Sequence, residues 1–265
     1  MCELLAISSA APIRVRYSLE EFAKHGGLTH LNKSGWGISF YHERDAEIFR
    51  EPRPASDSAL AEFVAQYEFT RRHVLAHVRR ASIGQQTIEN THPFDRELHG
   101  RKHIFAHNGS LHELPTRIRL ASNRFLPVGE TDSEYAFCVL LERVVQMHDA
   151  PSLDERLTVV VDFAAELREL GDANFLYFDG EVLFAHAHKR HHDDGTQVVG
   201  PARPPGLHFA NHASVSIPGL DLTSDPGVDA AIVASVPLTD MGWTPLAEGA
   251  VIAIRDGRKV AHVAP

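Results

Sequence analysis

The chain of 265 residues contains only two cysteines, Cys2 and Cys138. Two cysteines are too few for a disulfide framework, and their scarcity is typical of a reducing compartment. Cys138 lies in the apolar segment SEYAFCVLLERVV, which predicts a buried helix, so we expect a small core residue there. Cys2 needs a separate explanation because it directly follows the initiator Met1.

Long apolar runs are also lacking. No segment approaches the roughly 18 uninterrupted apolar residues that suggest a membrane span. The N-terminal segment has no basic region ahead of its short apolar stretch, as a signal peptide would have. We therefore expect a cytoplasmic protein without a membrane partner.

Positive charge is scarce, with 26 lysines and arginines against 35 aspartates and glutamates and a formal net charge of -9. This balance repels a phosphate backbone unless basic residues cluster on one face, so nucleic acid is not an expected partner. The chain also lacks a G-x-x-x-x-G-K phosphate loop. With 43% apolar residues, its length suits one substantial core, and residues 1–265 are predicted to form a single domain.

Hydrophobic patterns predict strands at both ends of the chain and helices between them. Blocks of strands, helices and strands predict an α+β fold with largely antiparallel sheets. Residues 189–229 are polar and rich in proline, which favours a surface excursion. Predicted strands are residues 3–8, 35–41, 73–79, 102–108, 174–178, 181–186, 250–254 and 260–263; predicted helices begin near Ser18, Leu60, Ser133 and Ser152.

The position of Cys2 gives it a chemical option that an internal cysteine does not have. Removal of Met1 would place a free α-amine on the same residue as the thiol. An α-amine has an ordinary pKa of about 7.7 to 8, so it could act as the general base for its own nucleophile. The sequence therefore makes Cys2 a candidate nucleophile for amide cleavage.

Three other polar motifs could complete such a site. HNG ends a predicted strand, where the Asn108 amide and the Gly109 N–H could stabilise an oxyanion, although a type I′ hairpin turn is the alternative. Arg79 also ends a strand and could clamp a carboxylate, or it could simply be solvated. Asp132 precedes a predicted helix, where it could bind an ammonium group or cap the helix.

A histidine-rich tract at residues 186–194 suggests a metal site, because His186, His188, His191 and His192 lie near two aspartates. Zinc ligands need to be fixed by surrounding structure, whereas this tract looks like a strand end entering a solvated loop. We therefore expect imidazoles that face water, with no metal and no other cofactor.

Taken in order, the motifs resemble the class II glutamine amidotransferase family of N-terminal-nucleophile hydrolases. A cysteine follows the initiator Met, and the C-terminal segment 234–257 is similar to that of small stand-alone bacterial members. The chain departs from the family at Arg80, where an aromatic residue is frequent, and at Ser82, where threonine is common. The motifs in between are GWG at 35–37, H-x-R at 77–79, N-x-HPF at 90–94, HNG at 107–109 and ETDSE at 130–134.

The resemblance implies a four-layer αββα sandwich and a role for each candidate residue. Cys2 would take the γ-glutamyl group of glutamine as a thioester, and its α-amine would pass the proton to departing ammonia. Asn108 and Gly109 would form the oxyanion hole, Arg79 would bind the substrate α-carboxylate, and Asp132 would bind its α-ammonium.

The acceptor of the ammonia is missing from this sequence, so the resemblance implies a separate synthase subunit as a possible partner. One alternative is a hydrolase of γ-glutamyl amides or peptides that uses the same thiol with water as the acceptor. Another is a catalytically silent binding or regulatory protein that retains Met1.

Overall fold

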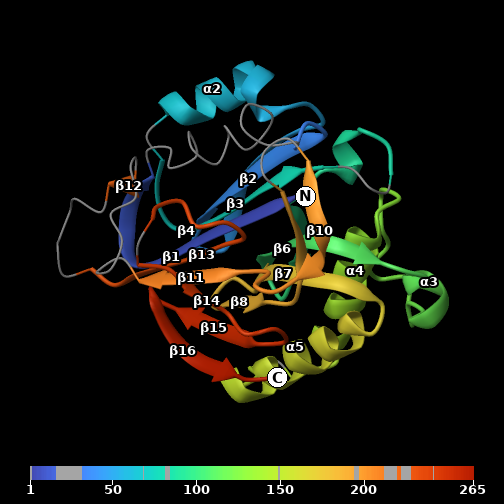
Figure 1. Cartoon of the computed structure of the whole chain (residues 1–265). Coiled ribbons are helices and arrows are strands. Elements are labelled where there is room, and N and C mark those ends of the chain that lie inside the picture. The colour runs from blue at the N-terminus through green and yellow to red at the C-terminus, as the bar shows by residue number, and fades with distance from the viewer. Residues whose placement is uncertain are drawn as a thin grey trace.

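Two antiparallel sheets lie face to face between helices, and Figure 1 shows α2 on one side of the pair and α4 and α5 on the other. The computed structural model describes residues 2–15, 32–67, 69–80, 84–148, 150–193, 197–211, 220–221, 228–240 and 242–265.

The first sheet has eight strands in the order β14-β11-β13-β1-β4-β2-β3, with β12 paired to β1. Its centre is the antiparallel pair β1 and β4, in which Glu3 lies opposite Val78. This register places Cys2 next to the end of β4. The strands are β1 (Glu3–Val15), β2 (Gly35–His42), β3 (Asp45–Glu51), β4 (Phe69–Arg79), β11 (His208–Asn211), β12 (Leu220–Asp221), β13 (Ala230–Ala234) and β14 (Thr244–Pro245).

The second sheet has six strands in the order β16-β15-β8-β7-β6-β5. Here Asn108 on β6 lies opposite Asn174 on β7. A separate hairpin is formed by β9 (Arg190–Asp193) and β10 (Val198–Arg203). The six strands are β5 (Phe94–Leu98), β6 (Arg101–Leu111), β7 (Gly171–Phe178), β8 (Leu183–His186), β15 (Val251–Arg255) and β16 (Arg258–Val263).

The helices cover the outer faces of the two sheets. Ala61 and Val64 of α2 (Ala59–Gln66) belong to the core against the first sheet. Phe137 of α4 (Asp132–Val144) and Phe163 of α5 (Leu153–Arg168) belong to the core against the second. Shorter turns are η1 (Ala55–Asp57), η2 (Ile88–Asn90) and α3 (Leu114–Arg117). The architecture is the predicted α+β αββα sandwich.

Strand alternation directs three candidate site residues toward the space between the sheets. Leu4 on β1, Leu75 on β4 and Ala106 on β6 belong to the core between the sheets. Side chains two or four residues apart on a strand share a face. Cys2, Arg79 and Asn108 therefore face the same space, at the end where β1 begins and β4 finishes.

Local signals predicted the hairpins correctly. Asp179 and Gly180 lie in the turn between β7 and β8, and Asp256 and Gly257 form the two-residue turn between β15 and β16. The capping box of Ser152 and Glu155 begins α5 as expected. The helix predicted from Ser18 lies outside the described residues.

Three expectations from the sequence are wrong. The first strand is longer than the predicted residues 3–8 and ends at Val15, and β5 lies between the predicted strands 73–79 and 102–108, where we expected no strand. Residues 189–229 are not simply a surface excursion, because β11 pairs inside the first sheet and Ala210 on it is fully buried.

Among the described residues, no helix combines the length and the apolar character needed to cross a bilayer.

Candidate active site

The Cys2 thiol is partly buried and is held by the main chain of Arg80. Its Sγ accepts a hydrogen bond from the Arg80 N–H at 3.1 Å, and the thiol faces the Arg80 carbonyl oxygen at 3.3 Å. Burial raises the pKa of the thiol, although the Arg80 N–H and the nearby Arg79 act in the opposite direction. The thiol is therefore protonated at neutral pH, and a nucleophilic role would require a base.

Asn108 contacts the same residue from the second sheet. Its Nδ2 donates a hydrogen bond to the Cys2 carbonyl oxygen, and its Oδ1 is buried without a hydrogen-bond partner among the described residues. Asn174 supports this arrangement from β7, because its Nδ2 donates to the Asn108 carbonyl oxygen at 3.2 Å. The Asn174 Oδ1 in turn accepts from the His188 N–H at 2.7 Å. The Asn108 amide is thus anchored beside Cys2.

Gly109 lies inside β6, which continues to Leu111, so the hairpin-turn interpretation of HNG is wrong. Its φ of +156° is a conformation that side chains disfavour, and a Cβ atom there would lie 1.7 Å from the Asp172 carbonyl oxygen. Glycine is therefore required by the close approach of β7.

Arg79 is not the solvated strand-end cation considered from the sequence, since only 3% of the residue is exposed. Its Nη1 donates to the Gln85 carbonyl oxygen at 3.2 Å and its Nη2 to the Gly84 carbonyl oxygen at 3.4 Å. Burial lowers the pKa of the guanidinium, and the nearby Cys2 thiol opposes this shift. The structure thus brings Arg79 close to the thiol.

Asp132 is the first residue of α4 and does not cap the helix. The cap is Thr131, whose hydroxyl accepts the Glu134 N–H at 3.2 Å. The Asp132 carboxylate accepts N–H bonds from Leu111 at 2.6 Å and from Ser133 at 2.8 Å. It therefore joins the start of α4 to the end of β6, close enough to Cys2 to act on the pKa of the thiol.

Three histidines are buried around this site. The rings of His77 and His92 lie 4.2 Å apart, and neither ring has a hydrogen-bond partner in the described part of the chain. Burial lowers the pKa of His77 to about 3 and that of His92 well below its usual value. His107 Nδ1 contacts the Ser133 hydroxyl at 2.9 Å, and burial lowers its pKa as well. All three imidazoles are neutral at neutral pH.

The histidine-rich tract differs from the water-facing loop that we expected. His186 and His188 are buried, and His191 and His192 lie on β9. His186 Nδ1 lies 2.6 Å from the Ala173 carbonyl oxygen. Within the described ranges, no group of three or more histidine, cysteine or acidic side chains could hold a metal ion.

Sequence reasoning missed the residues that support the site. Arg80 acts through its main chain, which leaves no residue-type signal, and Asn174 lies in a segment predicted only as a strand. Asn90 belongs to the N-x-HPF motif, but the motif alone gave it no role. Arg80 was noted only as a departure from the family pattern.

A cavity of about 510 Å³ lies elsewhere and is lined by residues that include Arg101 and His103 near the start of β6. At about 3.3 Å per strand residue, Arg101 is about 23 Å along β6 from Asn108. This cavity is therefore separate from the Cys2 site.

The sequence is similar to those of known and putative glutamine amidotransferases. The sequence model of the family described as "Glutamine amidotransferases class-II" matches residues 1–265. A putative glutamine amidotransferase of Haemophilus influenzae is 34% identical over 99% of this chain and 87% of its own length. The putative glutamine amidotransferase YafJ of Escherichia coli is 40% identical over 70% of this chain and 72% of its own.

Solved structures share the fold. The crystal structure of a predicted glutamine amidotransferase from Pseudomonas aeruginosa superposes with a TM-score of 0.71 at 28% identity, covering 98% of this chain and all of that one. Glutamine phosphoribosylpyrophosphate amidotransferase from B. subtilis gives 0.60 at 16% identity, covering 96% of this chain and 47% of its own. The chain belongs to the class II glutamine amidotransferases.

Proposed function

We propose that the chain hydrolyses the γ-amide of glutamine, with Cys2 as the nucleophile after removal of Met1. The observation that carries this proposal is the double anchoring of Cys2. Asn108 holds its carbonyl oxygen, and the Arg80 main chain holds its thiol, at the end of β4. A nucleophile has to be held in a fixed position, and these two contacts hold both the main chain and the thiol of Cys2.

In the proposed reaction, the Cys2 α-amine takes the thiol proton and the thiolate attacks the γ-carbonyl carbon of glutamine. The Asn108 amide and the Gly109 N–H stabilise the oxyanion of the tetrahedral intermediate. The α-ammonium then gives its proton to the leaving nitrogen, which departs as ammonia. Water hydrolyses the resulting thioester to glutamate and the free thiol.

We propose that the site recognises the substrate by binding its α-carboxylate and its α-ammonium. Arg79 lies beside the thiol with a fork of N–H donors that matches a carboxylate, and Asp132 supplies a negative charge for the α-ammonium. A fixed pair of opposite charges would select a zwitterion over a simple amide.

Residues 1–265 are proposed to act as one domain in the cytoplasm, where a thiol nucleophile stays reduced. Ammonia would pass to a separate synthase or be released.

The test is glutamate release from glutamine and from a panel of γ-glutamyl amides and peptides. Purified protein whose intact mass shows Cys2 as the first residue should release glutamate, and a Cys2→Ala variant should not. Preference for a γ-glutamyl amide over glutamine would support the amide hydrolase alternative. Equal activity in the Cys2→Ala variant would refute the nucleophile assignment.

A further inference from the structure

Asn90 lies between Arg79 and Asp132, the two residues that we propose to bind the charged groups of the substrate. It ends η2, and only 1% of the residue is exposed. Arg79 comes from the end of β4, whereas Asp132 begins α4, so no single element fixes the distance between them. Any device that sets this distance has to bridge the two segments.

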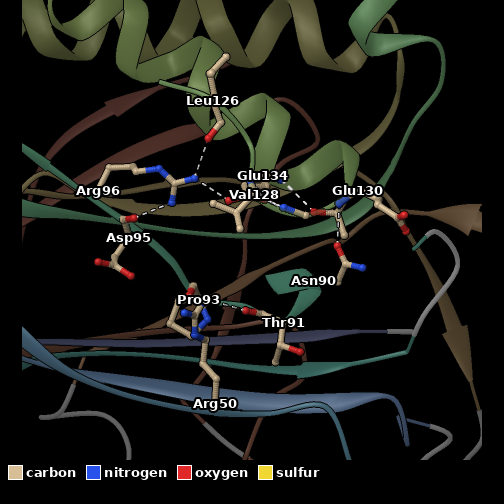
Figure 2. Close-up of polar contacts among 12 residues, drawn as sticks. Arg50, Asn90, Thr91, Pro93, Asp95, Arg96, Leu126, Val128, Glu130 and Glu134 are labelled. Atoms are coloured by element: carbon tan, nitrogen blue, oxygen red, sulfur yellow. Dashed lines mark hydrogen bonds and ion pairs between the residues drawn. The ribbon is translucent and has the colours of Figure 1, made fainter. Parts of the chain in front are cut away.

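The Asn90 side chain makes this bridge through both ends of its amide. Its Nδ2 donates to the Gln85 carbonyl oxygen at 3.2 Å, the same oxygen that accepts from Arg79 Nη1 at 3.2 Å. Its Oδ1 accepts the Glu130 N–H at 2.8 Å, two residues before Asp132 (Figure 2). The side-chain amide of Asn90 therefore connects the carbonyl oxygen that Arg79 binds to the segment that precedes α4.

The segment before α4 is fixed independently of Asn90. Glu134 Oε2 accepts the N–H groups of Val128 at 3.0 Å and Gly129 at 2.7 Å, and its other oxygen pairs with Arg96 at 2.6 Å. Figure 2 shows this carboxylate and the Arg96 guanidinium beside the loop that leads to Glu130. The Glu130 N–H is therefore presented at a fixed place.

The segment after Asn90 is fixed as well. The Arg50 side chain donates from β3 to the carbonyl oxygens of Thr91 at 3.2 Å and Pro93 at 3.3 Å. Figure 2 shows Arg50 reaching up from the first sheet to this turn. Asn90 thus links two segments that also have contacts of their own, and its amide joins them directly.

The loops around the Asn90 amide pack so closely against it that larger residues would not fit at two positions. A Cβ atom at Gly129 would lie 2.3 Å from Asn90 Oδ1, and one at Gly84 would lie 3.0 Å from Asn90 Nδ2. Gly84 also has a φ of +76°, which disfavours other residues. Two glycines therefore let both loops approach the amide closely.

We propose that Asn90 is a positioning residue that sets the spacing of Arg79 and Asp132 to match the α-carboxylate and α-ammonium of a glutamyl substrate. The role needs one donor and one acceptor on a short side chain, a combination that asparagine has and aspartate lacks. This inference rests on the proposed function, because it assigns a purpose to the same site.

The test compares two electrophiles that alkylate Cys2. A diazoketone analogue of glutamine carries the amino-acid end and needs the spaced pair, whereas iodoacetamide reports only on the thiol. The variant Asn90→Asp keeps the shape but places an oxygen against the Gln85 carbonyl oxygen. It should slow the diazoketone reaction by about tenfold or more, the scale of one lost buried hydrogen bond, and leave the iodoacetamide rate within about threefold.

Glu142→Gln is the matched control. Glu142 also lies on α4 and accepts N–H bonds from Ala121 at 2.6 Å and Ser122 at 2.7 Å, but it is about 15 Å along the helix from Asp132. This variant should lose thermal stability without changing the ratio of the two alkylation rates. If Asn90→Asp does not fold, Asn90→Ser, which cannot reach both partners, takes its place.

The outcomes separate the two proposals. If the wild type reacts with the glutamine analogue and the Asn90 variant keeps the wild-type ratio of rates, the positioning role is wrong and the proposed function stands. Equal slowing with both electrophiles would also overturn it, because Asn90 would then support the thiol or the fold. If the wild type neither reacts with the analogue nor releases glutamate, both proposals fail.

Discussion

Buried neutral histidines predict that this protein loses stability in mild acid. His77, His92, His103 and His186 are at most 4% exposed. Burial lowers the pKa of His77, His103 and His186 to about 3, and that of His92 well below its usual value. In the unfolded chain each imidazole has a pKa of about 6.5. The unfolded state therefore binds protons that the folded state does not bind.

The sign and size follow from proton linkage. The contribution of these histidines to the free energy of unfolding is fully present above a pH of about 6.5. It is lost as the pH falls from there toward 3, because protonation of the imidazoles favours the unfolded chain. Between pH 7.5 and 5, each such histidine costs about 2 kcal/mol, and the four together cost about 8 kcal/mol. Asp179 opposes this loss, since burial raises the pKa of its carboxyl, but it is one group against four. Because folded proteins have about 5 to 15 kcal/mol of stability, unfolding is expected near pH 5.

Urea unfolding at pH 7.5, 6.5 and 5.5, at constant ionic strength, measures this loss. Near pH 5.5 the unfolding free energy should fall by about 5 kcal/mol per pH unit, and His103→Gln should reduce this slope by about a quarter. A free energy that stays flat from pH 7.5 to 5.5 would refute the reasoning, because the histidines would then titrate alike in both states.

Further predictions concern catalysis. Protein that retains Met1 should be inactive and protein that begins at Cys2 active, which intact mass and glutamate release decide; full activity with Met1 present would contradict the α-amine base. Asn108→Ala should lower kcat by about 10²- to 10³-fold with little change in KM, because the lost donor acts mainly in the transition state; an unchanged kcat would remove Asn108 from the oxyanion hole. Arg79→Lys and Asp132→Asn should each lower kcat/KM for glutamine by about thirtyfold or more and leave any cleavage of a truncated amide unaffected; equal losses on both substrates would make them structural.

Local signals predicted the elements that are set by nearby residues. The capping box at Ser152 requires only residues within one turn of α5, and the Asp256–Gly257 turn requires only a short backbone conformation. By contrast, β11 has only four residues and lies in a polar region, so its signal is too short to recognise. Its place in the sheet comes from pairing with β13, which lies about 20 residues later in the chain and leaves no local pattern.

The candidate site shows the same division. The order of the motifs identified the candidate residues, but contacts with residues distant in the sequence determine the conformation and hydrogen bonds of each one. Asn108 and Gly109 have the composition of a hairpin turn, yet pairing with Asn174 and Ala173 keeps them in a strand. At the start of α4, threonine, aspartate and serine could all cap the helix, and only the three-dimensional contact of Asp132 with Leu111 explains why Thr131 does so.

The surroundings of the thiol also support the α-amine as the base in the proposed reaction. A base must be free to take a proton at neutral pH and must hold it well enough to return it. Burial lowers the pKa of His77 and of His107, so neither imidazole holds a proton at that pH. The two ring nitrogens of His107 also already contact the Ser133 hydroxyl and the Asp172 carbonyl oxygen. The Asp132 carboxylate is already engaged by the N–H groups of Leu111 and Ser133. An α-amine has an ordinary pKa of about 7.7 to 8, so the amine exposed by removing Met1 would be able both to take a proton near neutral pH and to return it.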